Sequence, residues 1–272
     1  MPVSDSADGH VDDGDQAAAD IDGPALPINE LFTSLQGEGT LAGVPSVFVR
    51  TSGCNLRCWF CDSYHTSWEP THAWLGLEEI IAEIESFDAD HVVLTGGEPL
   101  LHEESVALLE ALDDRGYHTT VETNGTIDRD APIDLASISP KLESSTPTPA
   151  RAPDGGGASA NGSKNEGEWE QRHEANRIDL EALAALVEAT DFQLKFVVTD
   201  ESDMDEILEL LADLRDAADV PVPDQNVLLM PEGATRERLA ETRNRTADLA
   251  LEYGFRYTPR LHVDLWNDAP ET

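Results

Sequence analysis

Short β-type runs alternate with amphipathic helical segments along most of this 272-residue chain. Apolar blocks and every-second-residue alternation predict the strands, and apolar residues three or four positions apart predict the helices. The predicted strands cover residues 46–52, 91–95, 118–123, 135–140, 192–198, 225–230 and 255–262, and the predicted helices cover residues 77–87, 102–115, 178–190, 203–216 and 235–253. Strands that alternate with helices pair in parallel through right-handed crossovers, so we expect an α/β fold, either a closed or a partial (β/α) barrel.

Two segments interrupt this pattern. Residues 1–24 are acidic and rich in Ala and Gly, which predicts a disordered leader. Residues 143–176 are rich in Pro, Gly, Ser and charge, which predicts a low-complexity surface insertion without a core element. Because the pattern resumes after the insertion, residues 25–272 are expected to form one domain.

The chain is strongly acidic, with 55 Asp and Glu against 17 Lys and Arg and a formal charge of −38. This charge repels polyanions, so direct binding to RNA or DNA is not expected. No run of about eighteen apolar residues and no basic N-terminus is present, so we expect a cytoplasmic protein without a membrane segment. The spread of acids along the whole chain indicates adaptation to a high-salt cytoplasm. In so lysine-poor a sequence, Lys141 and Lys195 beside strand-like runs are expected to have defined roles.

All three cysteines lie together as Cys54, Cys58 and Cys61, in the spacing C-x3-C-x2-C. Thiolates at this density suit zinc or an iron-sulfur cluster, and a reducing cytoplasm disfavours disulfides. A structural zinc ion normally takes four protein ligands, so His65 or an Asp would have to supply the fourth. Three thiolates on a four-iron cluster instead leave one iron open to chemistry.

A glycine-rich turn, Thr95–Pro99 (TGGEP), follows the predicted strand 91–95. Its glycines allow the backbone to approach a ligand at a strand end, where α/β folds bind their ligands. The cysteine spacing, followed one strand later by this turn, resembles the radical S-adenosylmethionine superfamily. The resemblance implies a 4Fe-4S cluster whose open iron chelates S-adenosyl-L-methionine and releases a 5′-deoxyadenosyl radical.

Further motifs occur in order: SLQGEG at 34–39, VFVRTSGCNL at 47–56, CDS at 61–63, ETNGT at 122–126, SPK at 139–141 and RLH at 260–262. Over residues 27–266, apart from the insertion, the chain resembles the 7-carboxy-7-deazaguanine synthase family. That resemblance implies radical ring contraction of 6-carboxy-5,6,7,8-tetrahydropterin to 7-carboxy-7-deazaguanine with release of ammonia. It places the reaction in 7-deazapurine biosynthesis for queuosine or archaeosine in tRNA.

The same resemblance assigns roles to individual residues. The implied substrate-binding residues are Leu35, Gln36, Gly37, Glu38, Arg50, Thr95, Glu122, Asn124 and His262. The implied S-adenosylmethionine-binding residues are Phe60, Asp62, Gly96, Gly97, Glu98, Ser139, Pro140, Lys141, Leu229, Met230, Pro231 and Glu232. Ser63, where many relatives have Thr, is the implied Mg2+ ligand. The implied partners are an electron donor such as flavodoxin or ferredoxin and a second copy of the chain in a homodimer.

Other interpretations stay open at this point. Arg50 pairs either with the substrate carboxylate or with one of many surface acids, and Glu122 either binds substrate or satisfies backbone amides. His262 and Lys195 are either site residues or ordinary strand residues. For the whole chain, the alternatives are a glycyl-radical activase and a non-catalytic iron-sulfur or zinc module. The SLQGEG, SPK and RLH motifs favour the pterin enzyme over the activase.

Overall fold

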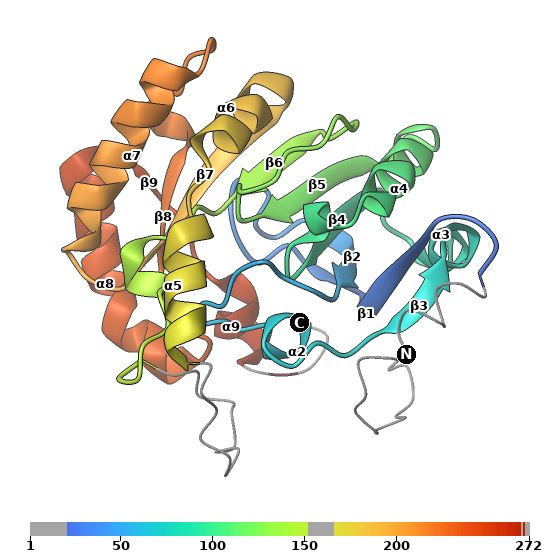
Figure 1. The fold of residues 1–272 in the computed structure, drawn as a ribbon, viewed down its shortest axis with the longest axis horizontal. Helices are drawn as coiled ribbons and strands as arrows, with labels where there is room; N and C mark the ends of the chain where they lie inside the picture. Colours follow the sequence, from blue (N-terminus) through green and yellow to red (C-terminus); the bar gives the residue numbers. More distant parts are fainter. Residues whose placement is uncertain (1–20, 152–165, 268, 270–272) are drawn as a thin grey trace.

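Nine strands form one mixed sheet in the order β3-β1-β2-β4-β5-β6-β7-β8-β9, in a computed structural model that describes residues 21–151, 166–267 and 269 (Figure 1). The strands are β1 (Ala25–Leu35), β2 (Pro45–Thr51), β3 (Ala73–Gly76), β4 (His91–Gly96), β5 (His118–Thr123), β6 (Leu135–Ile138), β7 (Asp191–Val198), β8 (Val227–Pro231) and β9 (Arg256–Tyr257). The helices are α2 (Tyr64–Ser67), α3 (Leu77–Glu85), α4 (Glu104–Asp113), α5 (Glu166–Asn176), α6 (Leu180–Ala189), α7 (Asp203–Ala217), α8 (Arg236–Tyr253) and α9 (Leu261–Trp266).

The strands from β2 to β9 along this order pair in parallel, as their alternation with helices predicts. β1 is the exception, because it pairs antiparallel with both β2 and β3. The sheet is not closed into a barrel: β3 and β9 are its two edges. The prediction of an α/β fold with a partial barrel is confirmed, whereas the closed alternative and purely parallel pairing are wrong.

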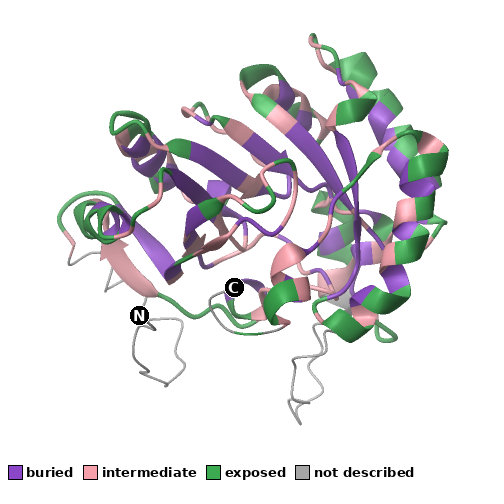
Figure 2. Cartoon of the chain, turned by 180° about the vertical axis from the view of Figure 1, so that it is seen from behind, coloured by how far each residue is buried: buried purple, intermediate pink, exposed green. Residues whose placement is uncertain are grey.

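Helices α3, α4, α6, α7 and α8 cover the outer face of the sheet, and α2, α5 and α9 lie together at one end (Figure 1). Figure 2 shows that the strands are buried over most of their length. The apolar core between the sheet and the outer helices includes Leu94, Leu109, Ile138 and Phe196, each at most 1% exposed. No helix within the described residues has the length and apolar character needed to cross a bilayer.

The five predicted helices and six of the predicted strands are present with small shifts at their ends. The seventh prediction, a strand over residues 255–262, is wrong. Only Arg256 and Tyr257 form a strand, and α9 begins at Leu261, whose N–H donates to the carbonyl of Gly37 at 2.8 Å. A contact distant in sequence therefore sets the conformation of the RLH motif.

The prediction that residues 143–176 lack a core element is also wrong in part. Residues 166–176 form helix α5, whose His173 is fully buried. Residues 1–20, most of the predicted leader, and residues 152–165, the middle of the predicted insertion, lie outside the described residues.

Candidate active site

A cavity of about 560 Å³ opens at the carboxyl ends of the parallel strands. Most of the candidate residues line it although they come from distant parts of the sequence. Those that do are Leu35, Gln36, Gly37, Glu38, Arg50, Cys54, Cys58, Phe60, Cys61, Asp62, Ser63, Thr95, Gly96, Gly97, Glu122, Asn124, Ser139, Lys141, Met230, Glu232 and His262. Glu98, Pro140, Leu229 and Pro231 are buried but do not line the cavity.

The loop between β2 and α2 carries the three cysteines to one side of this cavity. Burial raises the pKa of the Cys54 thiol to about 12, and burial likewise raises the pKa of Cys58 and of Cys61. Metal binding must therefore displace protons from these thiols. Within the described residues, no three Cys, His, Asp or Glu side chains converge on a point that could hold a single metal ion. Three soft sulfur donors on one loop beside the cavity, one fewer than a structural zinc ion normally takes, suit an iron-sulfur cluster with one open iron.

Gly96 and Gly97 end β4 directly behind the cysteine loop. Gly96 has φ +133°, a conformation that favours glycine, and a Cβ there would lie 2.0 Å from the carbonyl oxygen of Thr51. A Cβ on Gly97 would lie 2.1 Å from the carbonyl oxygen of Gly53 and 2.9 Å from Cβ of Cys54. A side chain at Gly96 would therefore push β4 away from the end of β2, and one at Gly97 would push this turn away from the cysteine loop.

Glu98 holds the neighbouring strand end instead of facing the cavity. Its carboxylate accepts the N–H of Asn124 at 2.7 Å, the N–H of Leu100 at 3.1 Å and the hydroxyl of Thr123 at 2.9 Å. Burial raises its pKa to about 7 in spite of these donors. Glu98 therefore acts on the site through Asn124, whose amide donates to Oδ1 of Asn55 in the cysteine loop at 2.9 Å.

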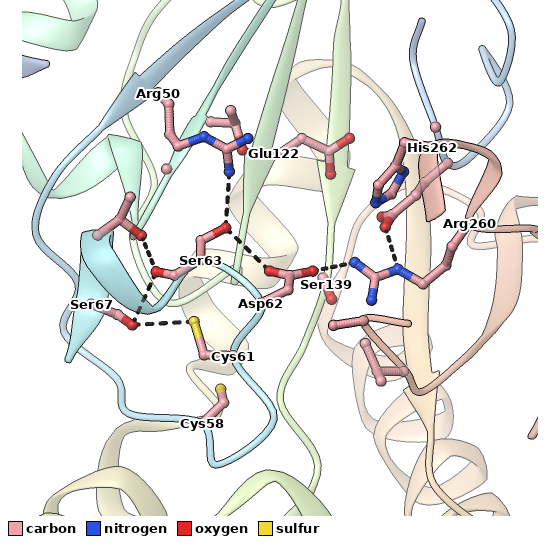
Figure 3. A pocket seen from close by; sticks show the side chains of 18 of the residues that line it. Arg50, Cys58, Cys61, Asp62, Ser63, Ser67, Glu122, Ser139, Arg260 and His262 are labelled. Atoms are coloured by element: carbon pink, nitrogen blue, oxygen red, sulfur yellow. Dashed lines mark hydrogen bonds and ion pairs between the residues drawn. The ribbon is translucent and has the colours of Figure 1, made fainter. Parts of the chain in front are cut away.

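Two buried cations organise the carboxylates of the cavity. Lys195 on β7 lies 2.6 Å from Oε2 of Glu38 and 2.8 Å from Oε2 of Glu122, and only 4% of its side chain is exposed. Arg260 contacts Glu38 at 2.9 Å and also pairs with Asp62 (Figure 3). A continuous chain of alternating charges thus runs from Asp62, next to the third cysteine, to Glu122 on β5.

These pairs favour the ionised forms of Glu38 and Asp62. Lys195 and then Arg260 hold the pKa of Glu38 well below its ordinary value even though burial acts in the opposite direction. Arg260 likewise lowers the pKa of Asp62 against the effect of burial. Burial lowers the pKa of Lys195, but Glu122 and Glu38 outweigh it and the net shift is upward. The cavity therefore offers charged acceptors both at its open side, where 45% of the Asp62 side chain is exposed, and deeper inside, where 14% of Glu38 is exposed.

Arg50 reaches the cavity from the end of β2. Its Nη1 donates to Oγ of Ser63 at 2.9 Å (Figure 3), and its guanidinium lies 5.5 Å from the ring centroid of Phe32. Its Nε lies 2.9 Å from Oε2 of Glu30, which is close enough for an ion pair, yet buried Nε has no partner in hydrogen-bond geometry. This donor is the kind of group that a bound carboxylate satisfies.

Gly37 and His262 meet at the opposite wall. A Cβ on Gly37 would lie 1.9 Å from Nδ1 of His262, so only glycine leaves room for the imidazole. Burial lowers the pKa of His262 below its ordinary value. The nearby amide of Gln36 donates to Oε1 of Glu122 at 3.2 Å, which joins the SLQGEG and ETNGT motifs.

Two residues of this site were missed as site residues from the sequence. Lys195 was expected to have a defined role, either in the site or on an ordinary strand, but was not assigned to substrate or cosubstrate, and Arg260 was noted only as part of the RLH motif. Only 7% of the Arg260 side chain and 4% of the Lys195 side chain are exposed. Such burial depends on the tertiary structure, so no local sequence pattern predicts it. Their ion pairs span up to 222 positions of sequence.

The Radical SAM superfamily model matches residues 48–141, the span from β2 to the end of the SPK motif. Fold, cysteine loop and glycine turn together define a radical S-adenosylmethionine enzyme. The chain is 64% identical, over all of both chains, to a 7-carboxy-7-deazaguanine synthase of Halobacterium salinarum. It is 38% identical to that of Rhodopirellula baltica over 88% of this chain and 86% of the relative. The chain therefore belongs to the 7-carboxy-7-deazaguanine synthase family.

A solved structure gives the same fold. The crystal structure of QueE from Escherichia coli superimposes with a TM-score of 0.60 and covers 92% of this chain and 98% of its own. Its sequence is only 23% identical, so this likeness supports the fold alone.

Proposed function

We propose that this chain converts 6-carboxy-5,6,7,8-tetrahydropterin into 7-carboxy-7-deazaguanine with release of ammonia. The observation that carries the proposal is that one cavity joins the three cysteines to Arg50 and to the carboxylates Glu38 and Glu122. When bound, the cluster and S-adenosyl-L-methionine supply the radical that removes a hydrogen atom from the substrate. The full-length identity of 64% to a 7-carboxy-7-deazaguanine synthase supports the same reaction.

The residues of the cavity have complementary roles in this proposal. Cys54, Cys58 and Cys61 hold the cluster. Arg50 binds the substrate carboxylate with its guanidinium, whose buried Nε lacks a hydrogen-bond partner. Glu122 accepts N–H groups from the edge of the pterin, and Lys195 holds that carboxylate in place at 2.8 Å.

The S-adenosylmethionine side of the cavity is formed by the SPK motif and the glycine turn. The ammonium of Lys141 donates to Oγ of Ser139 at 2.7 Å and to its carbonyl oxygen at 2.8 Å. We propose that Ser139 and Lys141 contact the cosubstrate, with Gly97 allowing it to approach the β4 backbone. Phe60, Met230 and Glu232 line the same cavity and complete this set.

We propose that Mg2+ binds at Ser63 together with the substrate carboxylate. The hydroxyl of Ser63 contacts both Nη1 of Arg50, at 2.9 Å, and Oδ1 of Asp62, at 3.1 Å. Hard oxygen donors of this kind suit Mg2+, which keeps most of its ligands from water and substrate. Activity is expected to fall when Mg2+ is removed by a chelator and to return when it is added back.

The reaction is tested with the full chain after anaerobic reconstitution. We expect about four irons per chain, and mass spectrometry is expected to detect the deazaguanine acid after reduction in the presence of both substrates. Cys58→Ser, which removes one cluster ligand, is the matched negative control. A colourless zinc protein, or transfer of a radical to a partner protein without this product, would contradict the proposal.

Several wider features belong to the same proposal. The electron donor is a small redox protein such as flavodoxin or ferredoxin, the active form is a homodimer, and the product serves queuosine or archaeosine formation in tRNA. We also propose adaptation to high salt, because 55 acidic residues repel one another unless salt screens them. The melting temperature is then expected to rise from low to molar KCl. A cytoplasmic location stays a prediction.

A further inference from the structure

Helix α5 lies against the cysteine loop although it belongs to the segment whose composition predicts an insertion without a core element. His173 on this helix is fully buried. Its Nδ1 accepts the backbone N–H of Arg57 at 3.1 Å, one residue before Cys58, and its Nε2 lies 2.8 Å from Oγ of Ser145. One side chain thus joins the cysteine loop to the chain that follows the SPK motif.

The partners of His173 define its protonation state. The backbone N–H of Arg57 can only donate, so Nδ1 carries no proton. The hydroxyl of Ser145 donates to the carbonyl oxygen of Leu142 at 2.6 Å, so it accepts from Nε2–H of His173. Burial also lowers the pKa of His173 to about 4, in agreement with this neutral tautomer. Both ring nitrogens are therefore satisfied in a fully buried position.

A second contact from α5 holds the same part of the loop. The guanidinium of Arg57 donates through Nη1 to the carbonyl oxygens of Cys54, at 2.7 Å, and Leu56, at 2.8 Å. Its other side lies 4.3 Å from the ring centroid of Trp169 on α5, a cation–π contact. The side chain of Arg57 thus holds the backbone between Cys54 and Cys58, and Trp169 of α5 packs on that side chain.

The next residues of the loop are held from the same direction. The backbone N–H of Trp59 donates to the carbonyl oxygen of Ser145 at 3.1 Å, and its indole N–H donates to that of Ser144 at 2.7 Å. Because Ser145 also accepts from His173, the contacts of α5 and of residues 144–145 form one network around Cys58. None of these contacts uses a cysteine sulfur, so all three thiolates stay available to the cluster while the loop is held.

We propose that α5 holds the Cys54–Cys58 segment in the conformation that binds the cluster, and that His173 is the positioning residue of this contact. The inference rests on the proposed cluster at the three cysteines. A loop that is already ordered loses less conformational entropy when it chelates the cluster, so it binds and retains iron better. The contact has a second consequence, because a covered loop exposes its thiols less often to reagents in solution.

The test compares three variants of the full chain. His173→Ala removes both hydrogen bonds, whereas His173→Gln retains an acceptor and a donor side by side. His91→Gln is the matched control, because it changes a buried histidine at the opposite end of the sheet, hydrogen-bonded to Ser46 and Thr120. Three quantities are measured: the melting temperature, iron retained in the presence of a chelator after reconstitution, and the alkylation rate of Cys58 in the apoprotein by peptide mass spectrometry.

We expect His173→Ala to lose iron and to be alkylated at Cys58 several-fold faster than wild type. His173→Gln is expected to recover much of both losses. His91→Gln is expected to retain iron and thiol protection like wild type even where its melting temperature falls. Wild-type behaviour of His173→Ala would overturn the inference. Iron loss and alkylation that follow only the melting temperature across all variants would also overturn it, because α5 would then contribute general stability alone.

The two proposals fail in different ways. A wild-type chain that binds no iron-sulfur cluster would contradict the proposed function, while alkylation of the apoprotein would still decide whether α5 positions the loop. A wild-type chain that binds the cluster, with His173→Ala unchanged in both measurements, would remove only the role of α5.

Discussion

The two ends of the parallel sheet bury polar side chains in different ways. Among the described residues, every buried Asp, Glu, Lys and Arg lies at the carboxyl end or on the strand that leads to it: Glu98, Lys195, Asp203, Glu232 and Arg260. The buried polar side chains at the amino end, by contrast, carry no charge. There His91 is 3% exposed, and its ring nitrogens lie 2.7 Å from Oγ of Ser46 and 2.8 Å from Oγ1 of Thr120.

This difference indicates that the polar groups of the amino end serve stability and those of the carboxyl end serve function. Both ends border the same apolar core, so both need their polar groups satisfied. At the amino end the fully buried groups are neutral, and the carboxylate of Asp134, which accepts the N–H of Thr119 at 2.7 Å, is 46% exposed. A buried ion pair is weak evidence for stability, since its desolvation offsets much of its Coulomb energy. The charges of Lys195, Glu232 and Arg260, which line the cavity, are therefore best explained by the polar substrate and cosubstrate proposed to bind there.

The largest effect is expected from Lys195→Met, which removes the cation between Glu38 and Glu122. Two largely buried carboxylates are then left with less compensation, since of these two Arg260 pairs with Glu38 alone. Breaking a buried pair in this way costs about 3–5 kcal/mol. Urea unfolding is expected to show a loss of this size, and turnover is expected to fall at least about a hundredfold because the carboxylates proposed to bind substrate lose their orientation.

A triple variant tests whether this charge is present for function. Lys195→Met combined with Glu38→Gln and Glu122→Gln removes the cation and both carboxylates together. It is expected to recover much of the lost unfolding free energy and none of the activity. A triple variant less stable than Lys195→Met alone would contradict the distinction between the two ends.

The stability contributed by the amino end is expected to fall between pH 6.5 and about 4, because of His91. Burial, and then the neighbouring His118, lower the pKa of His91 from 6.5 to about 4. The unfolded chain therefore takes up a proton before the folded one does, so the stability contributed by neutral His91 is complete above pH 6.5 and is lost as the pH falls towards 4. The shift corresponds to at most about 3 kcal/mol. The pKa of Glu38 is also lowered, but from 4.5, so its contribution is lost only below that value.

The measurement is the free energy of unfolding of wild type and His91→Gln from pH 7.5 to pH 4. The difference between the two proteins is expected to shrink as the pH falls, because Gln does not titrate. A constant difference across this range would show that His91 is not held neutral by its surroundings. The same comparison on the Lys195→Met background reports whether the two ends act independently.

The elements that form this sheet were predictable where local periodicity is strong. The strand prediction for residues 118–123 matches β5 residue for residue, and the five helix predictions match five observed helices. β1 was missed because ALPINELFTSL does not alternate regularly and contains Pro27. Helix α5 was missed because EGEWEQRHEAN is polar and lacks an apolar stripe. Its burial comes from contacts of His173 and Trp169 with the cysteine loop, which no local pattern contains.

The candidate site likewise has a part that the sequence predicts and a part that depends on tertiary contacts. Motifs at the strand ends placed the cysteines, Arg50 and Glu122 around one cavity, because parallel strands bring their carboxyl ends together. The contacts of Glu98 could not be predicted, since its partners follow a different strand. Residue type and order thus located the site, whereas the pairing of its charges depends on the folded sheet.

A smaller effect is expected from Gly37→Ala at the carboxyl end. The added Cβ would lie 1.9 Å from Nδ1 of His262, so the imidazole must move. We expect KM for the pterin to rise about tenfold, equal to about 1.4 kcal/mol, with little change in melting temperature. Gly76→Ala is the control, because its Cβ would meet only Cγ2 of Ile21 at 3.2 Å and lies away from the cavity. An unchanged KM would show that the position of His262 does not affect substrate binding.

The smallest effect is expected from Glu85→Gln, which breaks an exposed ion pair outside both ends. Nε of Arg115 lies 3.1 Å from Oε1 of Glu85, and 41% and 53% of the two side chains are exposed. Water and salt screen such a pair, so its loss is expected to change the unfolding free energy by less than about 1 kcal/mol. In this chain the sign is informative, because removing one of 55 acidic residues also relieves repulsion. Urea unfolding at low and molar KCl separates the two terms: a loss at low salt indicates the pair, and a gain that disappears at high salt indicates general repulsion.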